Sequence, residues 1–86
     1  MNNDFENIWV RIISNQNKTF YTKRKIPFTY HVNGNILRPN HTNHNISKKD
    51  FYKAFVELPI SGPGVINSLV RGPAYVWSIL NDERII

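Results

Sequence analysis

The sequence predicts a small α+β domain with an N-terminal helix, a three-stranded antiparallel sheet containing an Asn-Gly hairpin, and two or three helices packed on one face of that sheet. Three observations lead to this fold class. Apolar residues recur at helical spacing near the N-terminus, aromatic and β-branched residues alternate with polar ones in the middle, and Pro and Gly divide an apolar C-terminal region. With 86 residues, of which 41% are hydrophobic, we expect a single domain over residues 1–86.

The first element is a helix predicted over residues 4–16. Its apolar residues recur three and four positions apart, as one stripe of an amphipathic helix does: Phe5, Ile8, Trp9, Ile12 and Ile13. The polar run at 15–17 is expected to end it.

Strands are predicted within 19–22, 27–32 and 35–38. Asn33 and Gly34 stand between the last two strands and favour a type I′ turn, because that turn needs positive φ at both central residues. A two-residue loop there pairs Val32 with Asn35, Tyr30 with Leu37 and Phe28 with Pro39. We expect this set to face the core, with His31 and Arg38 on the exposed face.

The C-terminal half is predicted to be helical. Ser47 followed by Asp50 fits the capping pattern for a helix over residues 48–58, ended by Pro59. A short helix is expected around 65–70, and Gly72-Pro73 begins another. The aromatic residues expected in one core are Trp9, Phe28, Tyr30, Phe51, Phe55 and Trp77.

Several classes of protein and site are disfavoured. The chain has no cysteine, which removes disulfides, thiolate metal sites and thiol catalysis. His41 and His44 have the spacing of two metal ligands, but the remaining ligands of a structural site are missing, so we expect no metal and no cofactor. We also expect a non-enzymatic protein, because no nucleophile or clustered acids can be recognised. Without an apparent signal peptide or a membrane-length apolar run, the expected location is cytoplasmic.

The charge is concentrated in the middle of the sequence. The formal net charge is +5, and the segment from Lys18 to Lys53 holds eight basic residues and one acidic residue, Asp50. A clustered basic surface on a small domain is typical of nucleic-acid binding, although an ordinary solvated face has the same composition.

The predicted function is therefore a small nucleic-acid-binding module, with DNA and RNA as open alternatives. Phosphate contacts would supply its affinity. The candidate residues come from a basic turn, the exposed strand face, a histidine-containing loop and the second helix: Lys23, Arg24, Lys25, His31, Arg38, His41, His44, Lys48, Lys49, Tyr52 and Lys53.

The order of helix, three strands and helix, with Ser47, Lys48, Lys49 and Lys53 at the second helix, resembles the double-stranded-RNA-binding domain. The resemblance covers about residues 4–58 and implies that these lysines contact phosphates. The sequence departs from that family between the first two strands, where 23–27 replaces a Gly-Pro-x-His element. It departs again in the second helix, which is aromatic in place of alanine-rich.

Two other interpretations remain open. In the first, the basic face holds an acidic protein partner, as in a regulatory module that inhibits or assists a nucleic-acid-processing enzyme. Alternatively, the apolar C-terminal helices would form a homo-oligomer, with Tyr75 and Trp77 as anchors.

Overall fold

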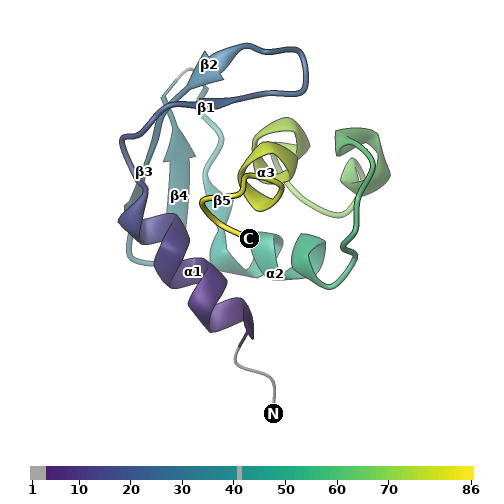
Figure 1. The fold of residues 1–86 in the computed structure, drawn as a ribbon, viewed down its shortest axis with the longest axis horizontal. Helices are drawn as coiled ribbons and strands as arrows, with labels where there is room; N and C mark the ends of the chain where they lie inside the picture. The colour runs from purple at the N-terminus through teal and green to yellow at the C-terminus, as the bar shows by residue number, and fades with distance from the viewer. Residues whose placement is uncertain (1–3, 41) are drawn as a thin grey trace.

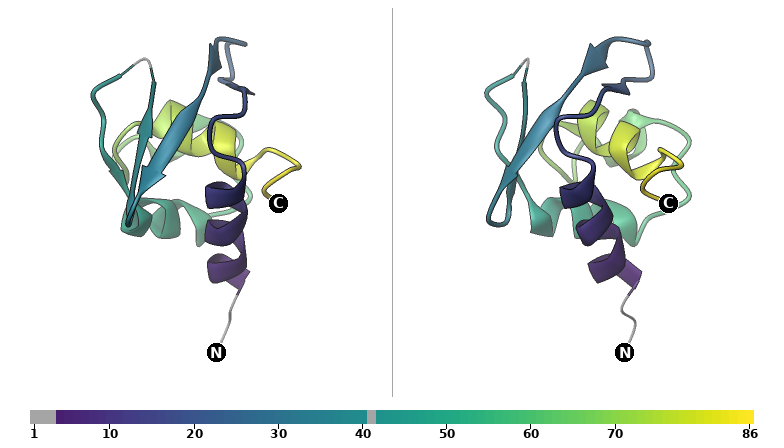
Figure 2. Two further views of the ribbon diagram at one scale, coloured as in Figure 1. Left: turned by 90° about the vertical axis from the view of Figure 1, so that its left-hand side faces the viewer. Right: turned by 60° about the vertical axis from the view of Figure 1, so that its left-hand side comes forward.

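The computed structural model describes residues 4–40 and 42–86, and it confirms the predicted α+β class (Figure 1). Helices α2 and α3 lie on one side of a small antiparallel sheet, and α1 runs beside them (Figures 1 and 2). The elements in chain order are α1 (Asp4–Ser14), β1 (Phe20–Tyr21), β2 (Pro27–Phe28), β3 (Tyr30–Asn33), β4 (Ile36–Pro39), β5 (Ile46–Ser47), α2 (Lys48–Phe55), the 3₁₀ helix η1 (Pro63–Ile66) and α3 (Pro73–Leu80).

Helix α1 forms as the apolar stripe predicts, but it ends at Ser14, two residues earlier than expected. The amide of Gln16 donates to the Ile13 carbonyl, three residues back, so the last turn tightens. Asn17 then adopts a φ of 69°, the left-handed conformation that often terminates a helix.

The strands form two sheets where the sequence predicted one of three strands. β1 and β2 make a two-stranded ladder, while the three-stranded sheet has the order β3-β4-β5. The expected strand over 27–32 is interrupted at Thr29, whose amide donates to the Asn40 side chain and whose carbonyl accepts from the Asn40 amide. β5 supplies the third strand and was missed, because two residues carry no detectable alternation.

The β3–β4 hairpin forms with a different register from the predicted one. Val32 pairs with Leu37 and Tyr30 with Pro39, so the turn is centred on Gly34 and Asn35. Gly34 has a φ of 64° and Asn35 is not in the positive-φ region, which is the sign pattern of a type II′ turn. Because the register differs by two residues, the strand side chains keep their predicted faces. Asn35, which was expected on the core face opposite Val32, instead lies exposed in the turn. Tyr30 is buried and His31 exposed, as expected.

Helix α2 begins as predicted and ends early. The Ser47 hydroxyl accepts from the Asp50 amide at 3.1 Å, which is the expected N-cap. The helix ends at Phe55, three residues before the predicted end. The amides of Glu57 and Leu58 bond three residues back, and the residue before Pro59 is disfavoured in the α conformation.

The short helix expected around 65–70 is the 3₁₀ helix η1, which begins two residues earlier and ends at Ile66. Helix α3 begins after Gly72 as predicted. Gly72 has a φ of 59°, and a Cβ there would lie 2.9 Å from Cδ1 of Ile46. Both the backbone conformation and the close approach of β5 therefore require glycine at this position.

One core joins all of these elements. Four of the six predicted aromatic residues are buried, and Phe55 and Trp77 pack against them half-buried. The largest fully buried side chains come from the strands, α1, α2, η1, α3 and the C-terminal residues: Phe20, Phe28, Tyr30, Leu37, Ile46, Ile12, Phe51, Ile66, Val76, Ile79, Leu80 and Ile85. Within the described residues, no helix has both the length and the apolar character needed to cross a membrane.

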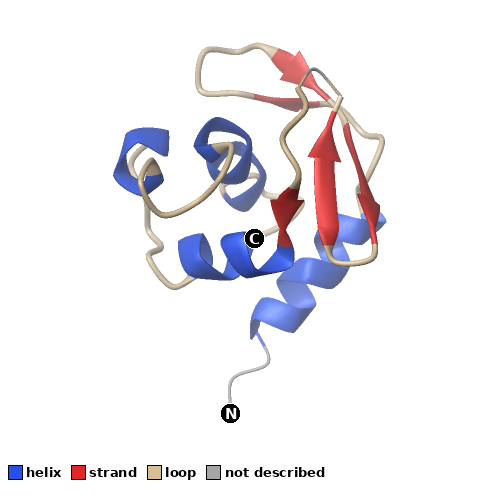
Figure 3. Ribbon diagram, turned by 180° about the vertical axis from the view of Figure 1, so that it is seen from behind, coloured by secondary structure: helices blue, strands red, loops and turns tan. Residues whose placement is uncertain are grey.

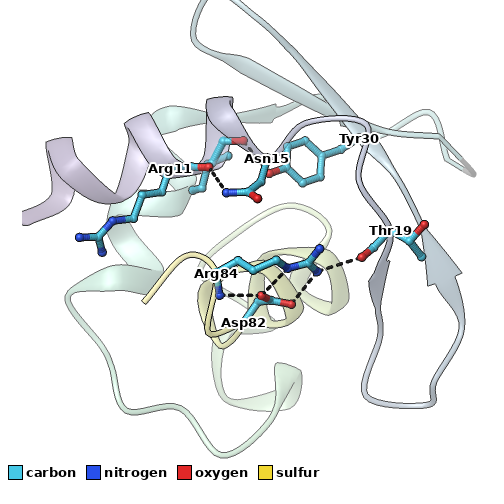
Figure 4. Close-up of polar contacts among 7 residues, drawn as sticks. Arg11, Asn15, Thr19, Tyr30, Asp82 and Arg84 are labelled. Carbon is cyan, nitrogen blue, oxygen red and sulfur yellow. Dashed lines mark hydrogen bonds and ion pairs between the residues drawn. The ribbon is translucent and has the colours of Figure 1, made fainter.

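Tyr30 ties the sheet to α1. Its buried hydroxyl donates to the Ile12 carbonyl at 2.6 Å (Figure 4). Burial raises the pKa of the Tyr30 hydroxyl well above its ordinary value, because the charged form would be desolvated.

The C-terminal residues are clamped to β1 by Arg84. Its guanidinium forms two 2.9 Å bonds with the Asp82 carboxylate and a 2.9 Å bond with the Thr19 carbonyl (Figure 4). The guanidinium carbon also lies 4.0 Å from the centroid of the Phe20 ring. The hydrogen bond from Arg84 lowers the pKa of the Asp82 carboxyl below its ordinary value.

We predict that Tyr30→Phe lowers the free energy of unfolding by about 0.5–1.5 kcal/mol, because the Ile12 carbonyl loses its short buried bond and keeps the 3.3 Å bond from the Asn15 amide. Tyr52→Phe is the matched control, since Tyr52 is half exposed and no hydrogen-bond partner is seen for its hydroxyl within the described residues. Urea unfolding measures both. The folded wild-type protein keeps the Tyr30 hydroxyl protonated, so its free energy of unfolding should fall as the pH rises past the ordinary tyrosine pKa of 10.0. The free energy of unfolding of Tyr30→Phe should fall less over the same pH range. Equal effects of the two substitutions would contradict this role.

We predict that Asp82→Asn destabilises the protein by about 0.5–1 kcal/mol at neutral pH, a magnitude suited to a partly exposed ion pair. Because the folded-state pKa of Asp82 is lowered, its contribution is fully present above the ordinary value of 3.8 and is lost as the pH falls through the lower, folded value. Unfolding curves from pH 7 to about pH 2 should therefore converge for variant and wild type at the acid end. Glu83→Gln, which removes the adjacent exposed carboxylate, should show no comparable convergence.

Candidate nucleic-acid interface

Apart from His41 and His44, the candidate residues are distributed among three places. The basic turn (Lys23, Arg24, Lys25) lies beyond the β1–β2 ladder at one end of the molecule, and α2 lies at the other end (Figures 1 and 3). His31 and Arg38 lie on the sheet face turned away from α2 and α3. His44 is exposed in the connection before β5, and His41 lies outside the described residues.

The basic turn is a three-residue hairpin loop made entirely of cations. Thr22 and Ile26 close it, with the Thr22 amide donating to the Ile26 carbonyl at 3.0 Å. Such loops place their last residue in the left-handed conformation, and Lys25 has a φ of 69°. A residue other than glycine is strained there by roughly 1–2 kcal/mol, and strain of this kind is often found at functional sites.

The three cations of the turn differ in their contacts. The Lys23 ammonium donates to the Ser61 carbonyl at 3.1 Å and lies 5.6 Å from the ring centroid of Trp77. Within the described residues, Arg24 and Lys25 are exposed and have no side-chain partner. Lys23 therefore anchors the turn, and the other two cations face solvent.

On the exposed sheet face, His31 and Arg38 are cross-strand partners. They line a shallow depression of about 340 Å³ together with Asn33, Ile36 and Asn45. Nε of Arg38 donates to Oδ1 of Asn45 at 3.1 Å, which orients the guanidinium. Among the residues that the structure describes, the terminal nitrogens of Arg38 have no partner, and they have the donor geometry that suits a phosphate or a base edge.

Two candidate residues of α2 already pack against α1. Nζ of Lys48 lies 3.0 Å from a carboxylate oxygen of Glu6 and 6.0 Å from the centroid of the Trp9 ring. The ring of Tyr52 meets the Phe5 ring edge-on, with the centroids 5.2 Å apart. Their contacts favour a role in joining the two helices over direct ligand binding.

Lys49 and Lys53 occupy the solvent side of α2. Lys53 lies 3.9 Å from the Asp50 carboxylate, a long and exposed pair that contributes little. Lys49 is exposed and has no partner within the described residues. The amide of Lys48 donates to the Asn35 carbonyl at 2.8 Å, so the start of α2 adjoins the turn of the β3–β4 hairpin.

Most of the basic residues are left without a carboxylate partner. Of the eight between Lys18 and Lys53, all of them within the described residues, Lys48 and Lys53 meet a carboxylate. The other six are exposed: Lys18, Lys23, Arg24, Lys25, Arg38 and Lys49.

Over residues 4–40 and 42–86, no group of three or more His, Asp or Glu side chains is arranged to hold a metal ion. The chain matches no family model, no curated protein and no solved structure. Five short strands in two sheets lie between α1 and α2, so the structure does not repeat the order of helix, three strands and helix on which the resemblance to the double-stranded-RNA-binding domain rests.

Sequence reasoning missed three contributors to these surfaces. Asn33 and Asn45 line the depression beside Arg38, and Tyr75 lies beside the basic turn. Tyr75 was expected as an oligomer anchor, but its ring meets the Phe28 ring edge-on at 4.9 Å, within the fold. The sequence does contain a signal for each of the two asparagines. Alternation along the strand places Asn33 on the same face as His31, and Asn45 belongs to the polar run before Ile46.

We predict that Lys25→Gly raises the free energy of unfolding by about 0.5–1 kcal/mol, because glycine removes the left-handed strain but loses more entropy on folding. Arg24→Gly, at the neighbouring position without a positive φ, is the control and should not stabilise. Thermal and urea unfolding of the three proteins provide the comparison. A less stable Lys25→Gly variant would show that the lysine conformation is not strained.

Proposed function

We propose that this chain is a small, non-enzymatic module that binds nucleic acid through its unneutralised basic residues. The observation that supports the proposal is the set of six exposed cations, between Lys18 and Lys49, that have no carboxylate partner in the fold. Exposed cations without a carboxylate partner gain from a polyanion, which releases its own counterions when they bind it. Phosphates are therefore the ligands that suit these cations.

The sheet face and the adjoining start of α2 form one candidate contact area. Arg38 offers charged donors, and Asn33 and Asn45 offer neutral ones that suit phosphate, sugar or base edges. Lys49 and Lys53 add two cations on the solvent side of α2. The affinity would come mainly from charge, with little discrimination between sequences.

The same cations would also attract an acidic protein surface. Oligonucleotide binding and its dependence on salt distinguish a nucleic-acid ligand from a protein partner. A nucleic-acid ligand predicts binding to oligonucleotides of mixed sequence that weakens steeply as salt is added. A protein partner predicts no such binding.

We predict that Lys49→Gln with Lys53→Gln weakens oligonucleotide binding and flattens its log–log salt dependence by roughly 1.5–2 units, one phosphate contact being lost per lysine. Neither change touches the buried residues of α2, Phe51 and Ala54, so the fold should persist. Fluorescence anisotropy at several salt concentrations measures the slope, and circular dichroism checks the fold.

Lys18→Gln is the control for this experiment. Lys18 is one of the six unpaired cations, but it lies between α1 and β1, outside the contact area of the sheet face and α2. It should change affinity and slope much less. If the folded double variant matches the wild type at every salt concentration, α2 is not part of the surface. If the wild type binds no oligonucleotide even at low salt, the nucleic-acid proposal is wrong.

A further inference from the structure

Beside the basic turn lies a mainly apolar pocket of about 410 Å³, between the β1–β2 hairpin and α3. This size falls within the range of roughly 300–1,000 Å³ that is usual for ligand sites. The turn contributes one wall, and the beginnings of η1 and α3 contribute the other. The residues that give it its character are Lys23, Arg24, Ile26, Pro63, Ala74 and Tyr75.

The walls of the pocket are held in place before any ligand binds. Lys23 spans from the turn to the Ser61 carbonyl, close to the start of η1. Tyr75 is supported from behind by Phe28, which is itself buried. A preformed pocket of this kind loses little entropy on binding, which favours affinity.

The chemistry of the pocket is divided. Its interior offers apolar groups and the tyrosine ring, and Ile26 is 52% exposed although it is a large aliphatic residue. Arg24 lines the pocket and Lys25 follows it in the chain, and within the described residues neither side chain has a partner. The complementary ligand is a flat, weakly polar group flanked by negative charges.

A nucleotide of a single strand has this composition, because its base is flat and its two neighbouring phosphates are anionic. A paired base inside a duplex cannot reach such a pocket without leaving its stack, which costs a few kcal/mol. Aromatic side chains beside a cationic track are the usual means of holding unpaired bases.

We propose that this pocket binds one unstacked base of a single-stranded nucleic acid, with the flanking phosphates on Arg24 and Lys25. The proposal rests on the nucleic-acid function inferred above and adds the class of ligand. It also explains why a strained lysine closes the turn, since glycine there would remove a phosphate contact.

The test compares three labelled ligands of equal length: a single strand of mixed sequence, its duplex, and an abasic strand that keeps the phosphates. Wild type should bind the intact single strand most tightly. Ala74→Leu extends a side chain into the pocket and should weaken that binding roughly 5- to 100-fold, the contribution expected of one stacked base. It should leave abasic-strand binding unchanged.

Ile26→Thr removes exposed apolar surface without disturbing the core. It should also weaken binding of the intact single strand and leave binding of the abasic strand unchanged.

Ser68→Leu adds the same side chain at an exposed position outside the pocket lining and should bind like wild type. Arg24→Gln with Lys25→Gln should weaken the intact and abasic strands alike. If both pocket variants bind the intact strand as wild type does, or if wild type binds the abasic strand equally well, the pocket proposal is overturned while nucleic-acid binding stands. Binding of no nucleic acid at all overturns both proposals. A peptide rich in Glu and Phe that binds more tightly than the strand, and is blocked by Ala74→Leu, identifies an acidic protein segment as the occupant and also overturns this inference.

Discussion

The rest of the fold depends on the hydrogen bonds that join the end of α1 to the edge of β3 that pairs with no other strand among the described residues. β3 is an edge strand, and two of its backbone groups meet the residues that follow α1. The Asn17 amide donates to the Tyr30 carbonyl at 2.8 Å, and the Gln16 side chain accepts from the Val32 amide at 3.0 Å. With the Tyr30 hydroxyl on Ile12, these bonds cover an edge that could otherwise pair with another chain. They also hold the hairpin so that its other face, with His31 and Arg38, is left open.

The acidic residues help to hold the fold together, and most of the basic ones do not. Asp82 orients Arg84 over Phe20, Glu6 pairs with Lys48 between α1 and α2, and Asp50 accepts from the Arg71 amide ahead of α3. Few carboxylates remain to neutralise the central cations. The positive surface therefore has two causes: the number of lysines, and the fact that most of the few carboxylates already bond to other groups of the fold.

Hydrophobic periodicity was enough to predict α1 and the buried face of the hairpin. The capping pattern at Ser47 and the Gly72-Pro73 pair predicted the starts of α2 and α3, because these signals are also local. The division into two sheets was not predictable in this way. It depends on Asn40 meeting Thr29 and on a two-residue β5, and both are tertiary contacts. The candidate residues were chosen by charge, which says nothing of placement, so their separation among three places required the fold. Lys48 and Tyr52 illustrate the difference, since their partners on α1 lie more than forty positions away in the sequence.

The ladder between β1 and β2 joins just two residue pairs, Phe20 with Phe28 and Tyr21 with Pro27. Its base is anchored by the buried rings of Phe20 and Phe28, whereas its tip is held by the turn bonds and by Lys23. Local opening is cheapest where few buried contacts must separate. The amides of Thr22 and Lys25 should therefore exchange with solvent deuterium well before those of β3 and β4. The hairpin tip thus forms a separate, less protected cooperative unit than the strands that carry the aromatic core.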